Sequence, residues 1–377
     1  MRKAENAVFS PETGFALTKL GLEAPRVEIP PPKVPTDNEL EQVLQQAKAR
    51  IIVVGCGGAG GNTISRIMSA GIQGGETIAI NTDAQDLLYT TANRKILIGR
   101  DITGGLGAGN DPEKGENAAR DDEAVVKDNI YGMDLVFVTC GLGGGTGTGA
   151  SPVVAEIAKK LGALTVGVVT LPFVVEGTRR RHNAERGLER LRSVADTVIV
   201  IPNDKLLQLA PDLPIGAAFK VSDQLLMDAI RGITEMITKP GLVNLDFADV
   251  RTVLQNGGVA MIGIGESDTS NRAEEAVDEA LNSPLLNVDI TGARGAIVNV
   301  TGSRDMTLEE VQKMVARVSE ALDTEANIIW GAQVSDNMKN TVRVMVVISG
   351  VHSPYVLGPG ESPRKKGEPI DLGLESL

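Results

Sequence analysis

The chain has 377 residues, which is enough for two or three domains that each bury a hydrophobic core. Its 37 basic and 49 acidic residues give a net charge of -12, which argues against a nucleic-acid-binding surface. Two cysteines are too few for a disulfide framework, no apolar stretch is long enough to span a membrane, and the first residues lack the apolar core of a signal peptide, so a cytoplasmic protein is expected.

The first part of the chain predicts an arm followed by a parallel α/β domain. Residues 1–36 contain the proline tract "EIPPPKVPT" and are expected to be disordered, and "DNELEQVLQQAKAR" then has helical spacing. Six short, β-branched, apolar segments alternate with helical ones, which is typical of a buried, doubly wound parallel sheet over 37–214. The six segments are "RIIVVG", "TIAINT", "KILIG", "DLVFVTC", "LTVGVVTLP" and "TVIVIPN". Ligands of such a sheet bind at the carboxyl ends of the strands.

The second part predicts a long helix and a smaller domain. A helix is expected over 215–238, closed by "KPG", so that 215–241 links two bodies. Over 242–350, four strand-like segments alternate with amphipathic helices, which indicates a smaller α/β domain with a mixed sheet. Residues 351–377 return to proline, glycine and charge and are expected to form a flexible tail. Its apolar tip, "IDLGLESL", favours a recognition motif that folds on a partner.

Two glycine-rich loops follow strands of the first domain, "GCGGAGGN" after the first and "GLGGGTGTGAS" after the fourth. A strand that ends in glycines and continues as a helix leaves unpaired N–H groups at the helix start, where an anion is favoured, so both loops predict phosphate binding. The chain contains no Gly-Lys dipeptide and so lacks the ordinary P-loop, which means that backbone N–H groups must hold the phosphates. Cys56 and Cys140 end the same two strands and are expected to be packing residues, not nucleophiles.

Three classes of function are open on this pattern. A nicotinamide-dependent oxidoreductase is suggested by Gly55, Gly57 and Gly60, which satisfy G-x-G-x-x-G, but it leaves the second glycine loop unexplained and offers only His182 and His352 as histidines. The second and third classes are a nucleotide-hydrolysing enzyme and a non-catalytic nucleotide-binding scaffold. In either of them, both glycine loops would bind phosphate.

Seven short motifs, which follow one another along roughly residues 45 to 350, resemble those of a known protein family. The chain resembles the FtsZ family, the prokaryotic cell-division GTPases of the tubulin superfamily, and its arm and tail look like those of archaeal members. The resemblance implies a tubulin-like α/β fold with a Rossmann-like GTP-binding domain, a central long helix and a smaller C-terminal domain for polymerisation. The motifs are "GCGGAGGN", "NTDAQDL", "GLGAGNDPEKG", "GGGTGTG", "TLPFVVEGTRRR", "IPNDKLL" and "NLDFADV".

The resemblance also implies a site for GTP or GDP with Mg²⁺. One side of the phosphates would be lined by Gly57, Gly58 and Asn62, and the other by Gly144, Gly145, Thr146, Gly147 and Thr148. Asn81 and Asp83 would lie on the phosphate and Mg²⁺ side, and the third loop, Gly107, Ala108 and Gly109, would close over the γ-phosphate.

The remaining part of the implied site holds the nucleoside. Glu176 and Arg180 would contact the ribose, although their segment also fits a solvated, salt-bridged helix start. Asn203 and Asp223 would read the guanine edge, with Phe219 against the face of the base. A carboxylate that accepts from the ring N–H and the exocyclic amine rejects adenine, which lacks that pair of donors. For Asp223, a polar helix residue without a ligand is the alternative.

Catalysis is implied to need a neighbouring subunit. Asp246 and Asp249 have the spacing of a capping box, and that structural role is expected to hold as well. In the family, Asn244, Asp246 and Asp249 would meet the nucleotide of the next subunit in a head-to-tail filament and orient the attacking water. A membrane-associated division adaptor would bind Ile370–Leu377, and the protein would act at the division site.

Overall fold

The computed structural model describes residues 48–209, 214–239, 241–243, 245–286, 290, 293–336 and 338–351. The expected arm, most of the helix that follows it and the tail beyond 351 lie outside these residues, and so does the predicted catalytic Asn244.

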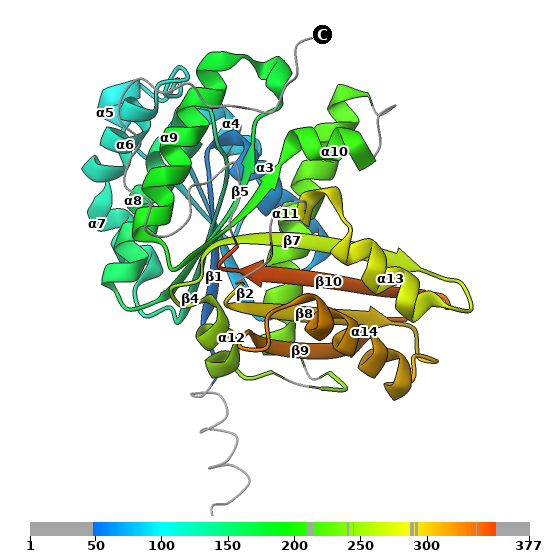
Figure 1. Cartoon of the computed structure of the whole chain (residues 1–377). Helices are drawn as coiled ribbons and strands as arrows, with labels where there is room; N and C mark the ends of the chain where they lie inside the picture. Colours follow the sequence, from blue (N-terminus) through cyan, green and yellow to red (C-terminus); the bar gives the residue numbers. More distant parts are fainter. Residues whose placement is uncertain are drawn as a thin grey trace, which may run out of the picture. The chain divides into compact units, whose positions relative to one another are not determined.

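The strands form one ten-stranded sheet in the order β3-β2-β1-β4-β5-β6-β7-β10-β8-β9. Strands β1 to β6 are all parallel, as the six apolar segments predict. Strand β7 pairs in parallel with β6 and β8 with β9, whereas β10 runs antiparallel to β7 and β8, so the last four strands make the expected mixed part. In Figure 1 these four lie across the direction of the first six. The bounds are β1 Ile51–Cys56, β2 Gly75–Asn81, β3 Arg94–Leu97, β4 Leu135–Gly141, β5 Leu164–Leu171, β6 Thr197–Pro202, β7 Gly258–Ser267, β8 Gly295–Gly302, β9 Asn327–Val334 and β10 Val342–Ser349.

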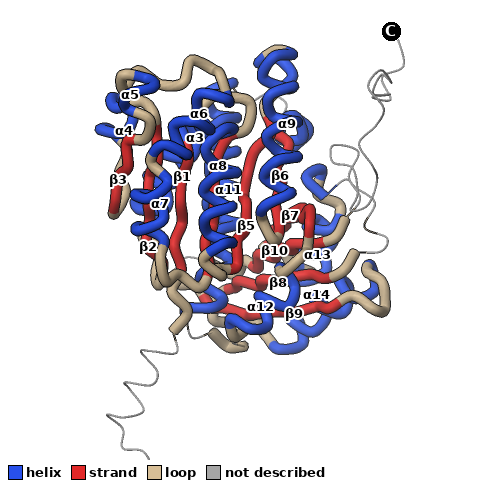
Figure 2. Tube along the Cα trace, turned by 90° about the vertical axis from the view of Figure 1, so that its left-hand side faces the viewer, coloured by secondary structure: helices blue, strands red, loops and turns tan. Residues whose placement is uncertain are grey.

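Helices cover both faces of the sheet, as Figure 2 shows for its parallel half. One hydrophobic cluster joins the sheet to α3, α10, α11 and α12, and the other joins it to α6 to α9, α13 and α14. Alternate residues of a strand enter opposite clusters because side chains alternate across a sheet: Ile51 and Val53 lie in one, Ile52 and Val54 in the other. The doubly wound α/β class is thus confirmed. The division of the chain into domains stays a prediction.

The helices include the long one expected over 215–238, with the same bounds. The sequence analysis predicts that helical segments alternate with the strands but gives no bounds for the helices between β3 and β4; there Asp111 caps α6 and Pro112 occupies its first turn. The bounds are α3 Gly57–Ala70, α4 Ala84–Tyr89, α5 Arg100–Thr103, α6 Pro112–Asp121, α7 Glu123–Ile130, α8 Thr146–Lys160, α9 Thr178–Val194, α10 Asn203–Leu209, α11 Ile215–Thr238, α12 Phe247–Leu254, α13 Arg272–Leu281 and α14 Leu308–Ala321, with 3-10 turns η1 Val174–Glu176 and η2 Pro284–Leu286.

Helix α6 packs directly on the start of α8 through backbone contacts that only glycine permits. A Cβ atom on Gly149 would lie 2.0 Å from the carbonyl oxygen of Pro112, and one on Gly115 would lie 2.4 Å from that of Gly145. Both distances are far below van der Waals contact, so any larger residue must push the two helices apart.

Replacing Gly149 with alanine is therefore expected to lower the free energy of unfolding by about 1–3 kcal/mol, because a packed backbone must move. Gly144→Ala is the matched control, since nothing lies within 4 Å of its Cβ position; its effect is expected to stay within about 0.5 kcal/mol. Thermal unfolding followed by circular dichroism compares the two variants. Equal stability of both would contradict the packing role of Gly149.

Candidate nucleotide-binding site

The loop that joins β1 to α3 lies against the loop that joins β4 to α8. Gly57 has a φ of +70°, and a Cβ atom there would lie 2.8 Å from the backbone nitrogen of Gly147. Neither α3 nor α8 has a side chain that caps its first N–H groups. These groups have no partner within their helix and carry the positive end of its dipole. Two uncapped helix starts side by side make a site for an anion such as phosphate.

The glycines of the second loop have two different environments. Gly144 has no atom within 4 Å of its Cβ position, so its backbone borders open space. In contrast, a Cβ on Gly145 would lie 2.8 Å from the Cβ of Ala108, and one on Gly147 would lie 3.1 Å from the carbonyl oxygen of Cys56. The abundance of glycine in this loop therefore reflects close packing of backbone as well as access for a ligand.

The two threonines of this loop use their hydroxyl groups inside the protein. The Oγ1 of Thr146 lies 2.6 Å from the Oγ1 of Thr82, and the Oγ1 of Thr148 accepts a hydrogen bond of 2.8 Å from the N–H of Gly143. Both threonines are buried. Their side chains thus fix the shape of the loop, which leaves backbone N–H groups as the donors for phosphate.

The third loop is anchored to the end of β2. The N–H of Ala84 donates to the carbonyl oxygen of Gly105 at 2.9 Å, and the N–H of Gly107 donates to that of Thr82 at 3.1 Å. Ala108 of this loop packs against Gly145 of the second glycine loop, since a Cβ atom on Gly145 would lie 2.8 Å from the Cβ of Ala108. The structure thus brings the three loops of the predicted phosphate site together, with Gly109 at a φ of +60° in open space.

The polar residues that follow β2 are engaged in local structure. The Oδ1 of Asp83 accepts hydrogen bonds from the N–H groups of Gln85 and Asp86 and so caps α4. Asn81 is buried, and its Nδ2 donates to the Oδ2 of Asp86 at 2.6 Å. The same oxygen lies 3.3 Å from the Cβ position of Gly58, so this network adjoins the first loop. Asn62 lies on α3 with an exposed side chain.

The residues predicted for the base meet between α3, α10 and α11. Asn203 is buried at the start of α10, and its Oδ1 accepts a hydrogen bond from the Oγ of Ser222. Asp223, next on α11, pairs with Arg66 of α3 at 3.4 Å. Burial raises the pKa of the Asp223 carboxyl above its usual value, and the guanidinium of Arg66 opposes that rise. An ionised acceptor in a half-enclosed site suits the paired donors of guanine.

An aromatic pair borders the same region. The ring of Phe219 stands edge to face against Phe173, with centroids 5.2 Å apart and an interplanar angle of 88°. Phe219 keeps 39% of its surface exposed, so part of this side chain is accessible to a ligand.

The two residues predicted for the ribose form an ion pair with each other. Glu176 ends the turn η1 and Arg180 lies in the first turn of α9, four positions later, and the Oε1 of Glu176 also accepts from the N–H of Phe173 at 2.9 Å. Glu176 therefore stabilises the turn that follows Phe173, and Phe173 in its turn contacts Phe219. Direct contact of either residue with a ribose stays a prediction.

The acidic pair lies at the opposite end of the sheet. Asp246 and Asp249 form the expected capping box of α12, with the N–H of Asp249 donating to Asp246 at 2.9 Å, and both side chains are exposed. The carboxyl end of α12 contacts the amino end of β6, where the hydroxyl of Thr197 donates to the carbonyl of Leu254. Figures 1 and 2 place α12 away from α4 and α5. Because β6 alone spans about 20 Å, these acids cannot reach the glycine loops of their own chain.

The cysteines lie beneath the two loops on neighbouring strands. Both are buried, and burial raises the pKa of Cys140 to about 12 and that of Cys56 well above its usual value. The burial of both side chains confirms that they pack beneath the loops, and a thiol with a raised pKa is a poor nucleophile.

Several residues of this region escape sequence reasoning. Thr82, Phe173 and Ser222 act through partners distant in the chain, and Asp86 and Arg66 look like ordinary polar residues of helices. Thr82, Asp86 and Phe173 lie within the motifs "NTDAQDL" and "TLPFVVEGTRRR", but only the fold brings each residue to its partner, so the sequence did not indicate their roles.

Comparison with known proteins gives matches over most of the chain. Residues 50–211 match the model of the Tubulin/FtsZ family, GTPase domain, and residues 258–352 that of the FtsZ family, C-terminal domain. The "Cell division protein FtsZ" of Methanothermobacter thermautotrophicus is 57% identical, covering 88% of this chain and 87% of the relative. The "Cell division protein FtsZ 1" of Thermococcus kodakarensis is 59% identical, covering 90% and 92%.

A solved structure has the same fold. The FtsZ dimer of M. jannaschii superposes with a TM-score of 0.81 at 59% identity, covering 84% of this chain and 93% of that one. Among the residues that the structure describes, no helix is long and apolar enough to cross a membrane.

Proposed function

The chain belongs to the FtsZ family of GTP-binding cell-division proteins, and from that premise we propose that it polymerises head to tail into filaments whose GTP is hydrolysed between neighbouring subunits. The observation that carries the proposal is the separation of two half-sites: uncapped helix starts at the carboxyl ends of the strands, and an exposed acidic pair at the other end. A site split in this way is complete only when one subunit stacks on the next.

We assign the phosphates of GTP to the backbone N–H groups of the two glycine loops. Gly57 and Gly58 line one side and the segment 144–148 the other, with the open space beside Gly144 as the entry for the phosphate chain. The third loop, 107–109, lies against Gly145 and is placed to respond to the γ-phosphate. Asn203 and Asp223 select guanine, and Phe219 covers the base.

Mg²⁺ fits this site as a companion of the phosphates. The described residues contain no group of three or more histidines, cysteines or carboxylates that could hold a metal alone. Mg²⁺ usually keeps several waters and binds through one or two carboxylates plus substrate phosphates. Asp83 has one carboxylate oxygen that is not used in capping α4 and is the residue we assign to it, directly or through water. The ion would neutralise phosphate charge.

The acids then act on the neighbouring subunit's nucleotide. Asp246 and Asp249 are exposed and fixed by their mutual capping hydrogen bonds, so they approach an incoming subunit in one geometry. There they would accept hydrogen bonds from the attacking water and orient it toward the γ-phosphate. Asn244, outside the described residues, is proposed to take part.

Assembly that depends on GTP tests this function. Light scattering is expected to rise after GTP is added to the full-length protein and to stay low with GDP, because only the triphosphate supports the interface between subunits. A rise of equal size with GDP, or none with either nucleotide at high protein concentration, would favour the alternative, a nucleotide-binding regulatory scaffold of the same fold. The family membership leaves no support for a nicotinamide-dependent oxidoreductase.

The tail is assigned a separate role. We propose that Ile370–Leu377, outside the described residues, binds a membrane-associated adaptor that brings the filament to the division site. Deleting 370–377 is expected to leave GTP hydrolysis and filaments unchanged and to abolish recruitment in cells, as followed by fluorescence microscopy. Loss of filament formation in the truncated protein would instead assign a structural role to the tip.

A further inference from the structure

Asn183 of α9 joins two of the loops assigned to the phosphates of GTP. Its Nδ2 donates to the carbonyl oxygen of Gly143 at 3.3 Å and to that of Asn110 at 3.4 Å. Gly143 lies at the start of the second glycine loop, and Asn110 directly follows the third loop, 107–109. An amide nitrogen carries two hydrogens, so one side chain can serve both carbonyls. A single half-buried side chain of α9 thus links the two loops.

Helix α9 holds this side chain in a fixed place. A Cβ atom on Gly187 would lie 2.4 Å from the Cγ2 of Thr148, and one on Gly143 would lie 2.9 Å from the carbonyl oxygen of Arg180. Both distances are below van der Waals contact, so α9 packs directly on the second glycine loop. The amide of Asn183 therefore cannot shift relative to this loop unless the packing opens.

The bond to Gly143 orients a donor of the second loop. The N–H of Gly143 donates to the Oγ1 of Thr148 at 2.8 Å, and its carbonyl accepts from Asn183, so the residue is held on both sides. In a trans peptide the C=O and the following N–H point in opposite directions, so the N–H of Gly144 is directed away from α9. Because Gly144 borders open space, this N–H is available to a phosphate.

The other bond of Asn183 holds the third loop. Asn110 has a φ of 61°, in the left-handed region that few residues other than glycine adopt. The N–H of Asp111 donates to the carbonyl oxygen of Ala108 at 3.1 Å and closes a turn around Asn110. Ala108 also packs against Gly145, so the third loop is fixed to the second at two points.

We infer that Asn183 is a positioning residue for the γ-phosphate, which acts through the two loops and not by contact with the nucleotide. It holds the N–H of Gly144 and the third loop in one arrangement, so that both can meet the triphosphate together. Since the third loop is assigned to the γ-phosphate alone, loss of these bonds should weaken the binding of GTP more than that of GDP. This role rests on the proposed function, because it requires the phosphates to lie at the glycine loops.

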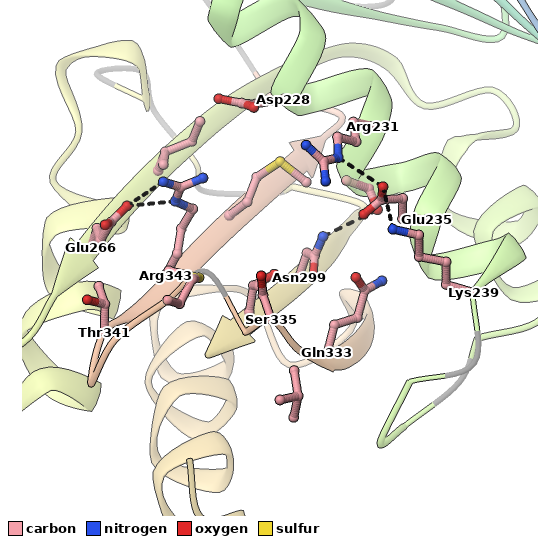
Figure 3. A pocket seen from close by; sticks show the side chains of 16 residues that line it. Asp228, Arg231, Glu235, Lys239, Glu266, Asn299, Gln333, Ser335, Thr341 and Arg343 are labelled. Atoms are coloured by element: carbon pink, nitrogen blue, oxygen red, sulfur yellow. Dashed lines mark hydrogen bonds and ion pairs between the residues drawn. The ribbon is translucent and has the colours of Figure 1, made fainter. Parts of the chain in front are cut away.

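Asn299 of β8 provides a matched control for the loss of such a link. It lines the pocket shown in Figure 3, and its Nδ2 donates to the carbonyl oxygen of Gly232 on α11 at 3.3 Å. This amide also joins two elements through a backbone carbonyl, but no residue of its pocket belongs to the candidate nucleotide site. Asn299→Leu should therefore lower stability without changing the preference for GTP over GDP.

Asn183→Leu keeps the approximate size of the side chain and removes the donor, and Asn183→Ala removes the donor with a residue that favours a helix. Equilibrium binding of GTP and of GDP to the full-length protein is measured below the concentration at which filaments form. In both variants the affinity for GTP is expected to fall roughly tenfold and that for GDP at most about threefold, because a neutral hydrogen bond to each loop is lost. Circular dichroism verifies that all variants are folded.

An unchanged ratio of GTP to GDP affinity in the Asn183 variants, an equal loss for both nucleotides, or the same fall of the ratio in Asn299→Leu would each overturn the positioning role. The proposed function fails on a different result, the absence of GTP-dependent light scattering in the wild type. Binding to single subunits does not depend on assembly, so the two failures are distinguishable.

Discussion

Asp249→Asn is expected to bind GTP and to assemble, yet to hydrolyse GTP roughly 10² to 10⁴ times more slowly than the wild type, which is the usual contribution of a positioned acid or base. Asparagine keeps an oxygen that can accept from the N–H of Asp246, so the capping box and α12 should persist. What is lost is the negative charge that polarises water at the next subunit's nucleotide. Phosphate release measured in filaments gives the rate.

Two further variants separate chemistry from structure. Asp249→Ala removes the charge and also the hydrogen bond that this carboxylate accepts from the N–H of Asp246, while Asp246 still caps α12, so any additional loss of stability measures that one bond of the capping box, about 1 kcal/mol. Asp323→Asn is a matched exposed control that should hydrolyse GTP at the wild-type rate. Wild-type turnover in Asp249→Asn would remove this carboxylate from the catalytic site.

Asp223→Asn is expected to weaken GTP binding roughly tenfold or more and to reduce the preference for guanine over adenine, because a charge-assisted acceptor is replaced by a neutral amide. The partner Arg66 then keeps its charge without a counter-ion at 3.4 Å. Calorimetry with GTP and ATP measures both effects. An unchanged affinity and selectivity would show that Asp223 does not contact the base.

The same carboxylate predicts a pH dependence. Burial raises the pKa of Asp223, so this carboxylate takes up a proton at a higher pH than an exposed aspartate does. Once protonated, it no longer provides a charged acceptor for the two donors of guanine. GTP affinity of the wild type is therefore expected to fall as the pH is lowered toward that raised pKa, whereas the affinity of Asp223→Asn should change less over the same range. Parallel pH profiles would contradict this assignment.

The parallel sheet and the long helix could be predicted from the sequence because they depend on local signals. Apolar, β-branched segments gave all ten strands, and the Pro-Gly stop after α11 gave its end. The bounds of α6 were not predicted, although Asp111 followed by Pro112 is a helix-start signal, because both residues lie within a motif that was used only for the resemblance.

The candidate site was predictable only in part. The glycine loops stand out because backbone access has a compositional signature, and the structure brings them together. That signature cannot distinguish Gly144, beside open space, from Gly149, which packs against α6, because the distinction depends on a helix elsewhere in the chain. Likewise, the pairing of Arg66 with Asp223 joins residues 157 positions apart and leaves no local pattern.

Phosphate release measured against protein concentration tests the shared site most directly. If Asp246 and Asp249 complete the site of an adjacent subunit, the rate per subunit should be near zero below a threshold concentration and rise above it. In Gly144→Leu a bulky side chain would fill the open space beside the phosphate loop, but the acids of α12 remain intact. Mixing this variant with Asp249→Asn should restore hydrolysis above the level of either variant alone. At a mixed junction, the intact nucleotide pocket of the Asp249→Asn subunit meets the intact acids of the Gly144→Leu subunit. A rate per subunit that is independent of concentration, with no recovery in the mixture, would contradict catalysis between subunits.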